Sequence, residues 1–375
     1  MKILINCSTL KAGGGLQVAN SICDQLPRFS NHQFTVVLSS YLQPTFENIC
    51  NKKNIEACIY DFPTTLFSVL FGRDKMLDEL VEQHQIDVVL TIFGPSRWKP
   101  RVPHLSGFAI PHLLIPESPY FKKISVIDRL KWKCRGSIIK WSLRRSSDAF
   151  WTENPLTSER LQKMMAPKYV YTVSNYYNQV FDQPKRWNRG YNLPMFNGTT
   201  CLSIAAPYPH KNLNIIADIV KYFKVACPDF KVRFVLSCNS EDCNIPEYLN
   251  DYIIYLGKID VSACPYLYEQ ADIMFMPTLL ECFSATYPEA MRMGIPIVTT
   301  DIVFARGLCG DAACYFSPND PVAAAKAIYK VATDKNYAKL LCESGKEKLQ
   351  TYDNYEQRAE KLIGILEKIA DYSKI

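Results

Sequence analysis

The feature that most constrains the fold of this chain is a repeated alternation between short apolar runs rich in β-branched residues and longer segments with helical periodicity. The apolar runs predict strands at 2–6, 34–38, 87–92, 200–206, 231–238, 252–257, 272–277 and 296–300. The periodic segments predict helices at 16–26, 212–226, 263–271, 321–334 and 354–370. Strand and helix in repeated succession predict an α/β fold, with parallel sheets covered by helices on both faces. Ligands of such sheets bind outside the carboxyl ends of the strands, so candidate residues are expected there.

The alternation is interrupted at 182–198 by a polar stretch that contains Pro and Gly and lacks periodicity. Such a stretch is typical of a linker. The chain has 375 residues, which corresponds to about two domains. We therefore expect two doubly wound Rossmann-like domains, over 1–181 and 199–352, with a closing helix in 353–375.

Cysteine usage and hydropathy indicate the compartment. The 14 cysteines are scattered without a paired framework, and the apolar run at the start of the sequence is too short for a secretory signal. Both features predict reduced thiols in the cytoplasm. The apolar runs all fall short of the roughly 18 residues of a membrane span, so none is expected. The net charge of +6 permits an anionic partner.

Two glutamates, Glu281 and Glu289, lie between the predicted strands at 272–277 and 296–300. Pro288 suits the first turn of a helix, which places Glu281 on a loop and Glu289 in that first turn. A helix N-terminus attracts phosphate, and carboxylates accept hydrogen bonds from sugar hydroxyls. The pattern is compatible with a nucleotide-sugar site. The alternative is that Glu289 complements the helix dipole while Glu281 is a solvated loop residue.

Three further features are candidates for the site, and two of them suit a phosphate. Gly13, Gly14 and Gly15 separate the first strand from the first helix, where glycine lets the backbone approach a phosphate. Lys211 precedes the helix at 212–226, where an ammonium group can neutralise a diphosphate. His112 follows an apolar run that ends near the cleft side. The alternatives are a flexible glycine loop, a solvated lysine and a structural histidine.

The segment 121–145 combines apolar periodicity with strong positive charge. Its apolar residues repeat every three or four positions, at Ile124, Ile127, Leu130, Cys134, Ile138 and Trp141. It holds nine Lys or Arg residues and one acid, Asp128. Such a helix favours an anionic membrane surface, with membrane-facing residues Lys131, Trp132, Lys133, Arg135, Lys140, Arg144 and Arg145. The alternative is a helix that packs its apolar face on the first domain's sheet and leaves its basic face solvated. Nucleic acid is not expected, because no recognised binding motif accompanies the charge.

Several motifs together resemble the GT-B glycosyltransferases, specifically glycosyltransferase family four. They are Gly13–Gly15, "YPHKNL" (208–213), "ADIMFMPTLLECFSATYPEAMRMGIPIVTTD" (271–301) and "GDAACYFSPND" (310–320). The similarity is firm from about residue 200 to 330 and looser before that. It implies two Rossmann-like domains facing a cleft, with the acceptor bound in the first and the donor in the second. It also implies that the helix in 353–375 returns to the first domain.

The resemblance assigns donor-binding roles in the second domain. Glu289 is expected at the ribose hydroxyls of a nucleotide-diphospho-sugar. Glu281, with the backbone N–H groups near Phe283 and Ser284, is expected at the donor sugar and diphosphate. Lys211 is expected at the diphosphate, where it stabilises the charge of the leaving group.

The resemblance also assigns roles in the first domain. Gly14 is expected to approach the donor diphosphate, and His112 is expected near the donor sugar. The implied reaction retains the anomeric configuration and needs no metal or other cofactor, which agrees with the absence of Asp-x-Asp from the sequence.

The sequence departs from the family pattern at three places. Ala206 stands where the family commonly has an arginine, so Lys211 is expected to act with another cation, such as Arg292 or Arg306, or to stabilise the diphosphate less. Cys282-Phe283-Ser284 replaces Gly-Phe-Gly, and Leu113 replaces the aspartate after the histidine.

These observations predict a retaining hexosyltransferase that extends a lipid-linked glycan, as in surface polysaccharide, O-antigen or capsule assembly. It would lie in the cytoplasm, peripherally on the inner face of the membrane. The alternatives are a nucleotide-sugar 2-epimerase and a catalytically degenerate, membrane-bound assembly partner.

Overall fold

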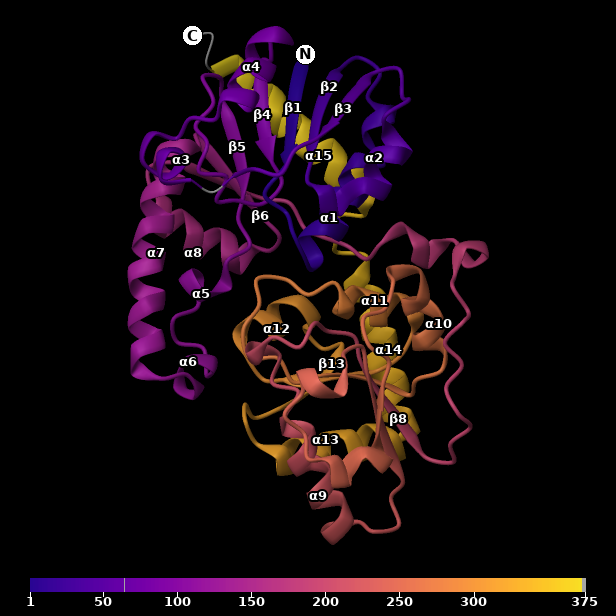
Figure 1. Ribbon diagram of the computed structural model, residues 1–375. Helices are drawn as coiled ribbons and strands as arrows, with labels where there is room; N and C mark the ends of the chain where they lie inside the picture. Colours follow the sequence, from indigo (N-terminus) through magenta and orange to yellow (C-terminus); the bar gives the residue numbers. More distant parts are fainter. Residues whose placement is uncertain (64, 373–375) are drawn as a thin grey trace. The chain divides into compact units, whose positions relative to one another are not determined.

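The computed structural model describes residues 1–63 and 65–372, which divide into two compact units (Figure 1). The first unit comprises 1–114, 125–175 and the chain from Asp353 onward. The second comprises 115–124 and 176–352. The predicted boundary at 181 assigns 115–124 to the first domain, whereas the structure groups this segment with the second unit. The segment 115–124 groups with the second unit because it contacts loops that lie far away in sequence, at Leu279 and Asn212.

The first unit contains a seven-stranded sheet in which neighbouring strands are parallel, with the order β3-β2-β1-β4-β5-β6-β7. Its strands are β1 (Lys2–Cys7), β2 (Gln33–Leu38), β3 (Ile55–Ile59), β4 (Val88–Thr91), β5 (His104–Gly107), β6 (Ala149–Thr152) and β7 (Tyr169–Thr172). β1 sets the register, with Ile3 opposite Phe34 of β2 and Val88 of β4. The strand order reverses between β1 and β4, so this sheet has a topological switch point.

The first unit also contains helices, several of which pack on its sheet. They are α1 (Gly14–Cys23), α2 (Gln43–Ile49), α3 (Leu66–Phe71), α4 (Lys75–Gln83), α5 (Pro111–Leu114), α7 (Val126–Ser146), α8 (Pro155–Met165) and α15 (Tyr355–Tyr372), with 3-10 turns η1 (Leu26–Arg28) and η2 (Ser40–Leu42). Figure 1 shows α15, in yellow, beside the indigo strands of this unit. Leu362 and Leu366 of α15 are buried in the same core as Ile3 of β1. The last helix is therefore part of the first unit.

The second unit contains a six-stranded parallel sheet with the order β10-β9-β8-β11-β12-β13. Its strands are β8 (Thr199–Ser203), β9 (Val232–Leu236), β10 (Ile253–Tyr255), β11 (Ile273–Met276), β12 (Ile297–Thr300) and β13 (Ala313–Phe316). Its helices are α6 (Tyr120–Lys123), α9 (Ile215–Ala226), α10 (Cys264–Glu269), α11 (Thr286–Met293), α12 (Val303–Cys309), α13 (Pro321–Thr333) and α14 (Lys335–Leu349). Its 3-10 turns are η3 (Gln179–Asp182), η4 (Pro184–Arg186), η5 (Pro209–Lys211), η6 (Ser240–Asp242), η7 (Glu247–Tyr252) and η8 (Val261–Ala263).

The second sheet is built from the runs that read as buried strands. Phe234, Phe275 and Val298, from β9, β11 and β12, lie in one apolar core with α9 and α13. The order reverses between β8 and β11, which places the loops after these two strands at the switch point. The two predicted parallel sheets are thus confirmed. The predicted linker at 182–198 packs within the second unit, where Leu193 N–H donates to Gln270 Oε1 at 2.8 Å.

Candidate functional site

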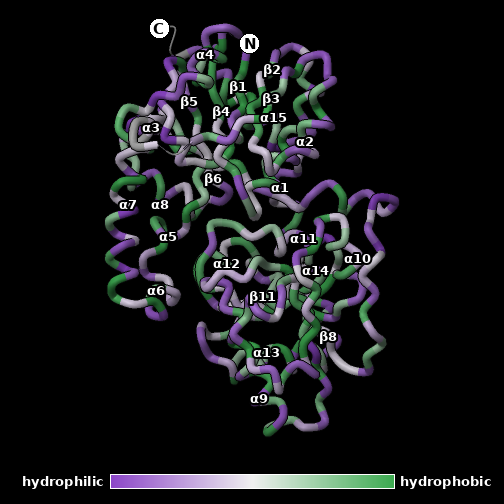
Figure 2. The backbone as a smooth tube through the Cα atoms, viewed as in Figure 1, coloured by the Kyte–Doolittle hydropathy of each residue, from purple (hydrophilic) through white to green (hydrophobic). Residues whose placement is uncertain are grey.

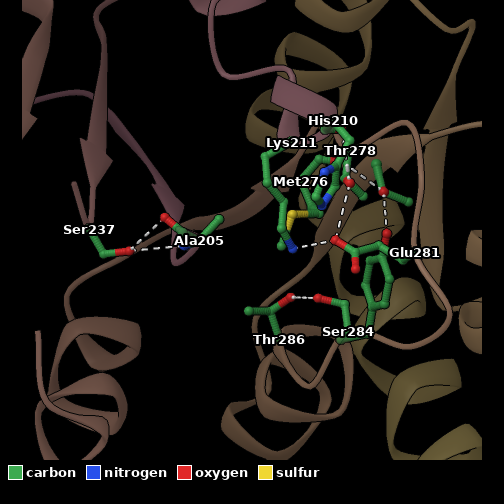
Figure 3. A network of polar contacts seen from close by, with 11 residues as sticks. Ala205, His210, Lys211, Ser237, Met276, Thr278, Glu281, Ser284 and Thr286 are labelled. Atoms are coloured by element: carbon green, nitrogen blue, oxygen red, sulfur yellow. Dashed lines mark hydrogen bonds and ion pairs between the residues drawn. The ribbon is translucent and has the colours of Figure 1, made fainter. Parts of the chain in front are cut away.

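A buried ion pair joins the two loops at the switch point of the second sheet. Lys211 lies in η5, after β8, and Glu281 lies on the loop after β11. The Lys211 ammonium donates to Glu281 Oε1 (Figure 3). The two side chains are only 13% and 11% exposed. Glu281 is therefore not a solvated loop residue, and that alternative is wrong.

The same loops are joined a second time through their backbones. The carbonyl of His210 accepts a hydrogen bond from the N–H of Leu279 at 2.8 Å. It also accepts one from the hydroxyl of Thr278 at 3.2 Å, and this hydroxyl lies 3.3 Å from Glu281 Oε1 (Figure 3). These contacts fix the spacing of the two loops independently of the Lys211–Glu281 pair.

His210 contributes its backbone and its ring in an uncharged form. Burial, with the neighbouring Lys211 ammonium, lowers the pKa of its imidazole to about 4. The ring stacks on Tyr208 with 5.6 Å between centroids and meets the edge of Tyr120 at 6.1 Å. The imidazole is thus neutral near pH 7 and packs between aromatic rings.

Glu289 is buried in the first turns of α11. The helix begins at Thr286, close to the predicted start, and Gly294 ends it in the left-handed conformation (φ 69°). Only 7% of Glu289 is exposed, and the Tyr268 hydroxyl donates to its Oε2 at 3.1 Å. Burial raises the pKa of the Glu289 carboxyl to about 7, while the Tyr268 hydrogen bond lowers it less. A carboxyl held in this way changes its charge near neutral pH.

Phe283 and Ser284 lead into α11. Phe283 is buried, with its ring edge-on to Tyr352 at 6.0 Å. The Ser284 and Thr286 hydroxyls lie 2.9 Å apart at the start of the helix (Figure 3). The N-terminus of α11 carries partial positive charge. The second unit therefore brings a cation, two carboxylates and a helix N-terminus to the carboxyl edge of one sheet.

The glycine loop belongs to the first unit. Gly13 has φ 71°, a conformation that favours glycine, and Gly14 is the first residue of α1. A Cβ at Gly13 or Gly14 would meet no atom within 4 Å, so the backbone there borders open space. At Gly15 a Cβ would lie 3.3 Å from Leu10 Cδ2, so this glycine permits close packing.

His112 also belongs to the first unit, on α5. Its ring stacks on Trp132 of α7, with 3.9 Å between centroids and 9° between the planes. Trp132, predicted to face a membrane, is thus half-buried against His112. The stacking supports the structural alternative for His112, and its catalytic role stays a prediction.

The cations suggested as partners of Lys211 have carboxylates of their own. Arg292 donates to Asp182 at 2.7 Å. Arg306 makes two hydrogen bonds to Asp301, at 2.5 and 2.8 Å. Their action on a diphosphate beside Lys211 stays a prediction.

α7 exposes its apolar residues instead of burying them. Val126, Ile127, Leu130, Ile138 and Trp141 are 47–75% exposed, and Cys134 is exposed as well. The buried residues of the helix are Gly136, Ile139, Ser142, Leu143 and Ser146. The alternative in which the apolar face packs on the sheet is therefore wrong. The buried face of α7 consists of these other residues, most of which are smaller than the exposed apolar ones. A Cβ at Gly136 would lie 2.5 Å from Leu113 Cδ2, so glycine permits this close approach.

Basic residues flank this exposed apolar stripe. At 100° per residue the stripe spans about a third of the helix circumference. Lys133, Lys140 and Arg129 lie along one of its borders; Lys131 and Arg135 lie along the other. Figure 2 shows hydrophobic and hydrophilic residues interleaved along α7. We call the stripe and these flanking bases the α7 surface.

The α7 surface continues onto α3. Arg145 donates to the carbonyl of Leu70, and its guanidinium lies 4.3 Å from the centre of the Trp141 ring. Leu70 and Phe71 are 50% and 62% exposed. Apolar side chains from two elements thus gather around one arginine. No described helix is long and apolar enough to cross a membrane.

Comparison with known proteins shows a family match within the second unit. Residues 198–334 match the family "Glycosyl transferases group 1". A 94-residue stretch is 30% identical to the O-antigen chain mannosyltransferase B of Escherichia coli, and it spans a quarter of this chain and a quarter of that protein.

Solved structures share the fold over 98% of the chain. Sucrose-phosphate synthase from Thermosynechococcus elongatus superposes with a TM-score of 0.68 at 13% identity, covering 98% of that chain. A glycosyltransferase from Rickettsia africae does so with a TM-score of 0.68 at 14% identity, covering 98% of that chain. The Anabaena protein HepE in complex with UDP-glucose also superposes with a TM-score of 0.68 at 14% identity, covering all of that chain. The fold is therefore that of the GT-B glycosyltransferases, and the narrower assignment to family four stays a prediction.

Proposed function

We propose that this chain, which carries a glycosyl transferases group 1 domain on a GT-B fold, is a glycosyltransferase that moves a sugar from a nucleotide-diphospho-sugar to a growing polysaccharide. The observation that carries the proposal is the buried Lys211–Glu281 pair at the switch point of the second sheet. The likeness to a protein solved with UDP-glucose and to an O-antigen mannosyltransferase supports a nucleotide-sugar donor and a glycan product.

The chemical groups of a nucleotide-diphospho-sugar match the charges of the site. The N-terminus of α11 and the Lys211 ammonium favour the diphosphate. Glu289 accepts hydrogen bonds from the ribose hydroxyls, and Glu281 orients both Lys211 and the donor sugar. The experiment below is designed to identify the base and the sugar of the donor and the linkage that is formed.

The transfer step follows from what these groups stabilise. The bond between the anomeric carbon and the diphosphate oxygen breaks as the acceptor oxygen bonds to the same face of that carbon. The acceptor proton passes to an oxygen of the leaving diphosphate. Lys211 and the α11 N-terminus stabilise the charge that develops on the leaving group, which is electrostatic catalysis without a metal. Retention and metal independence are what the family resemblance implies.

The α7 surface supports a lipid-linked acceptor. Exposed Ile127, Leu130 and Ile138 enter the boundary between lipid headgroups and acyl chains, while the flanking lysines and arginines attract anionic lipid. An enzyme held in this way would lie on the cytoplasmic face of a membrane, where a lipid-linked glycan is within reach. A 2-epimerase acts on a soluble nucleotide-sugar and gives this surface no role.

The test is a thermal-shift series with UDP, GDP and their sugar conjugates, first without metal and then with EDTA. Binding to the native state raises the melting temperature by mass action. A shift that persists in EDTA, followed by sugar transfer to a membrane extract with a product that keeps the anomeric configuration of the donor, supports a retaining, metal-free transferase. A shift with conversion of the donor alone identifies the epimerase. No shift with any of these compounds contradicts the proposal and favours the degenerate assembly partner.

A further inference from the structure

The segment 115–124, here called the strap, lies in sequence between two parts of the first unit but packs within the second. Ile115, Ser118 and Tyr120 of the strap are each less than 8% exposed. The next residue, Ser125, is the N-cap of α7, and its side chain accepts from Asp128 N–H. The strap thus leads directly into the α7 surface.

The strap is tied to the Glu281 loop through Ser118. The Ser118 hydroxyl donates to the carbonyl of Leu279 at 2.6 Å and accepts from the N–H of Tyr120 at 3.1 Å. Leu279 stands two residues before Glu281, and its N–H bonds to the carbonyl of His210. Ser118 therefore holds Leu279, the residue whose N–H connects the two loops of the donor site.

The strap is also tied to the Lys211 loop. The ammonium of Lys123 donates to Asn212 Oδ1 at 2.5 Å, and the ring of Tyr120 meets the ring of His210 edge-on. Asn212 is buried and has φ 56°, a left-handed conformation that few residues adopt. The strap thus contacts the residues on both sides of Lys211.

We propose that the strap is a positioning element of the donor site, in which Ser118 and Lys123 hold the Lys211 and Glu281 loops at the spacing that nucleotide-sugar binding requires. This rests on the proposed function. Neither residue touches the donor. They act through the carbonyl of Leu279 and the amide of Asn212, and small displacements of positioning contacts weaken catalysis and binding strongly.

The experiment measures the dissociation constants of UDP-glucose and GDP-mannose for full-length variants. Ser118→Ala removes the bond to Leu279, and Lys123→Met removes the bond to Asn212. We expect each variant to weaken binding of the recognised donor about tenfold. Lys123→Met is expected to keep a melting temperature close to that of the wild type, whereas Ser118→Ala is expected to lower it, because the Leu279 carbonyl loses a buried partner. Lys123→Arg keeps a cationic donor and is expected to retain most of the affinity.

Ser96→Ala is the matched control, because Ser96 is a buried serine of the first unit whose hydroxyl donates to the Trp98 carbonyl at 3.1 Å.

A double-mutant cycle separates positioning from a general loss of stability. Asn212→Gly removes the acceptor while permitting the left-handed backbone. If Lys123 acts through Asn212, the effects of Lys123→Met and Asn212→Gly on donor affinity are not additive. Donor affinities within twofold of wild type in both Ser118→Ala and Lys123→Met would overturn the proposal. A lower melting temperature with unchanged affinity would also do so, because it shows a structural role only.

The outcome also distinguishes this proposal from the function on which it rests. Wild-type protein that binds neither nucleotide-sugar contradicts the proposed function and with it the role of the strap. If the wild type binds a donor and all strap variants bind it equally tightly, only the proposed role of the strap is contradicted. If Ser118→Ala does not fold, Lys123→Met decides, because the Lys123 side chain is at the surface.

Discussion

The α7 surface and the carboxyl edge of the second sheet depart from ordinary burial in opposite directions. On α7, large apolar side chains such as Ile127 and Leu130 face solvent. At the edge of the second sheet, the ionisable side chains of Lys211, Glu281 and Glu289 are nearly excluded from solvent. Scattered exposed apolar residues are common, but a contiguous exposed stripe and a cluster of buried ionisable groups both need a reason.

The difference between the two regions is the reason for proposing a different kind of ligand for each one. An exposed apolar stripe is stabilised when another apolar phase covers it, which a bilayer provides. Buried charges are stabilised by each other and by a charged or polar ligand in the same place. The two regions therefore respond to different perturbations. When one region is changed, binding by the other serves as the reference.

The largest expected effect is loss of turnover in Lys211→Met. The variant loses the cation proposed to stabilise the leaving diphosphate, so kcat is expected to fall about 10²- to 10³-fold. It also leaves Glu281 buried without its partner, which is expected to lower the free energy of unfolding by about 3 kcal/mol. Initial rates and denaturant unfolding measure the two effects.

The double variant with Lys211→Met and Glu281→Gln separates these effects. It removes both charges, so stability is expected to recover while turnover stays low. Recovery of turnover together with stability would show that Lys211 has only a structural role. Vesicle binding by the α7 surface is expected to be unchanged in both variants.

The next effect concerns the α7 surface. Replacing Ile127 and Leu130 together by Ser is expected to weaken binding to anionic phospholipid vesicles about tenfold or more, since each buried aliphatic side chain contributes about 1.5–3 kcal/mol. The melting temperature is expected to stay the same, because both side chains are exposed in the free protein. Vesicle co-sedimentation measures the binding.

Val225→Ser is the matched control for this change, because Val225 of α9 is 85% exposed and lies in the second unit. It is expected to leave vesicle binding unchanged. Equal vesicle binding by the wild type and the Ile127/Leu130 variant would rule out the α7 surface as a membrane contact.

A change of similar or smaller size is expected from pH. With a pKa of about 7, the Glu289 carboxyl is mostly protonated at pH 6 and mostly ionised at pH 8. The ionised form accepts hydrogen bonds from both ribose hydroxyls, so nucleotide affinity is expected to rise about tenfold from pH 6 to pH 8. Titration calorimetry at several pH values measures this rise.

Glu289→Gln provides the reference for the pH effect. Its nucleotide affinity is expected to follow only the titration of the nucleotide itself. Because burial raises the pKa of Glu289 above its ordinary value of 4.5, the wild type is expected to lose stability relative to Glu289→Gln as pH rises from about 4.5 through 7. Parallel pH profiles for the two proteins would contradict the assignment.

The smallest effect is expected from salt. Raising the salt from 0.1 to 0.3 M is expected to weaken vesicle binding about fivefold, because the bases around the α7 stripe are exposed and screened. Nucleotide affinity is expected to change less, since the Lys211–Glu281 pair is shielded from solvent. A larger effect of salt on nucleotide binding than on vesicle binding would reverse the comparison.

Much of the fold follows from the sequence because its signals are local. The β-branched runs at 200–206 and 296–300 have the composition of strands buried on both faces, and they form β8 and β12. Pro288 and Gly294 delimit α11 closely, because a proline favours the first turn of a helix and a glycine favours its end. The same local logic selected Lys211, Glu281 and Glu289 as candidates.

Other features needed the tertiary structure because they depend on contacts between distant residues. Lys211 and Glu281 are 70 positions apart, and their pairing arises from the adjacency of β8 and β11. Ser118 and Tyr268 belonged to no motif, and the contacts of Lys123 and His210 appear only through the partners that the tertiary structure brings to them. The periodicity of α7 identified an apolar stripe, but periodicity is the same whether a stripe faces a sheet or solvent.

The sequence by itself therefore determined which elements form and that their sheets are parallel, and it supplied the candidate residues for a nucleotide-sugar, since these signals depend on neighbours a few positions away. The tertiary structure decided which face of α7 is buried, that the strap packs within the second unit and that Glu289 titrates near neutral pH. These properties depend on which surfaces exclude water, and that is fixed only when segments far apart in the chain pack together.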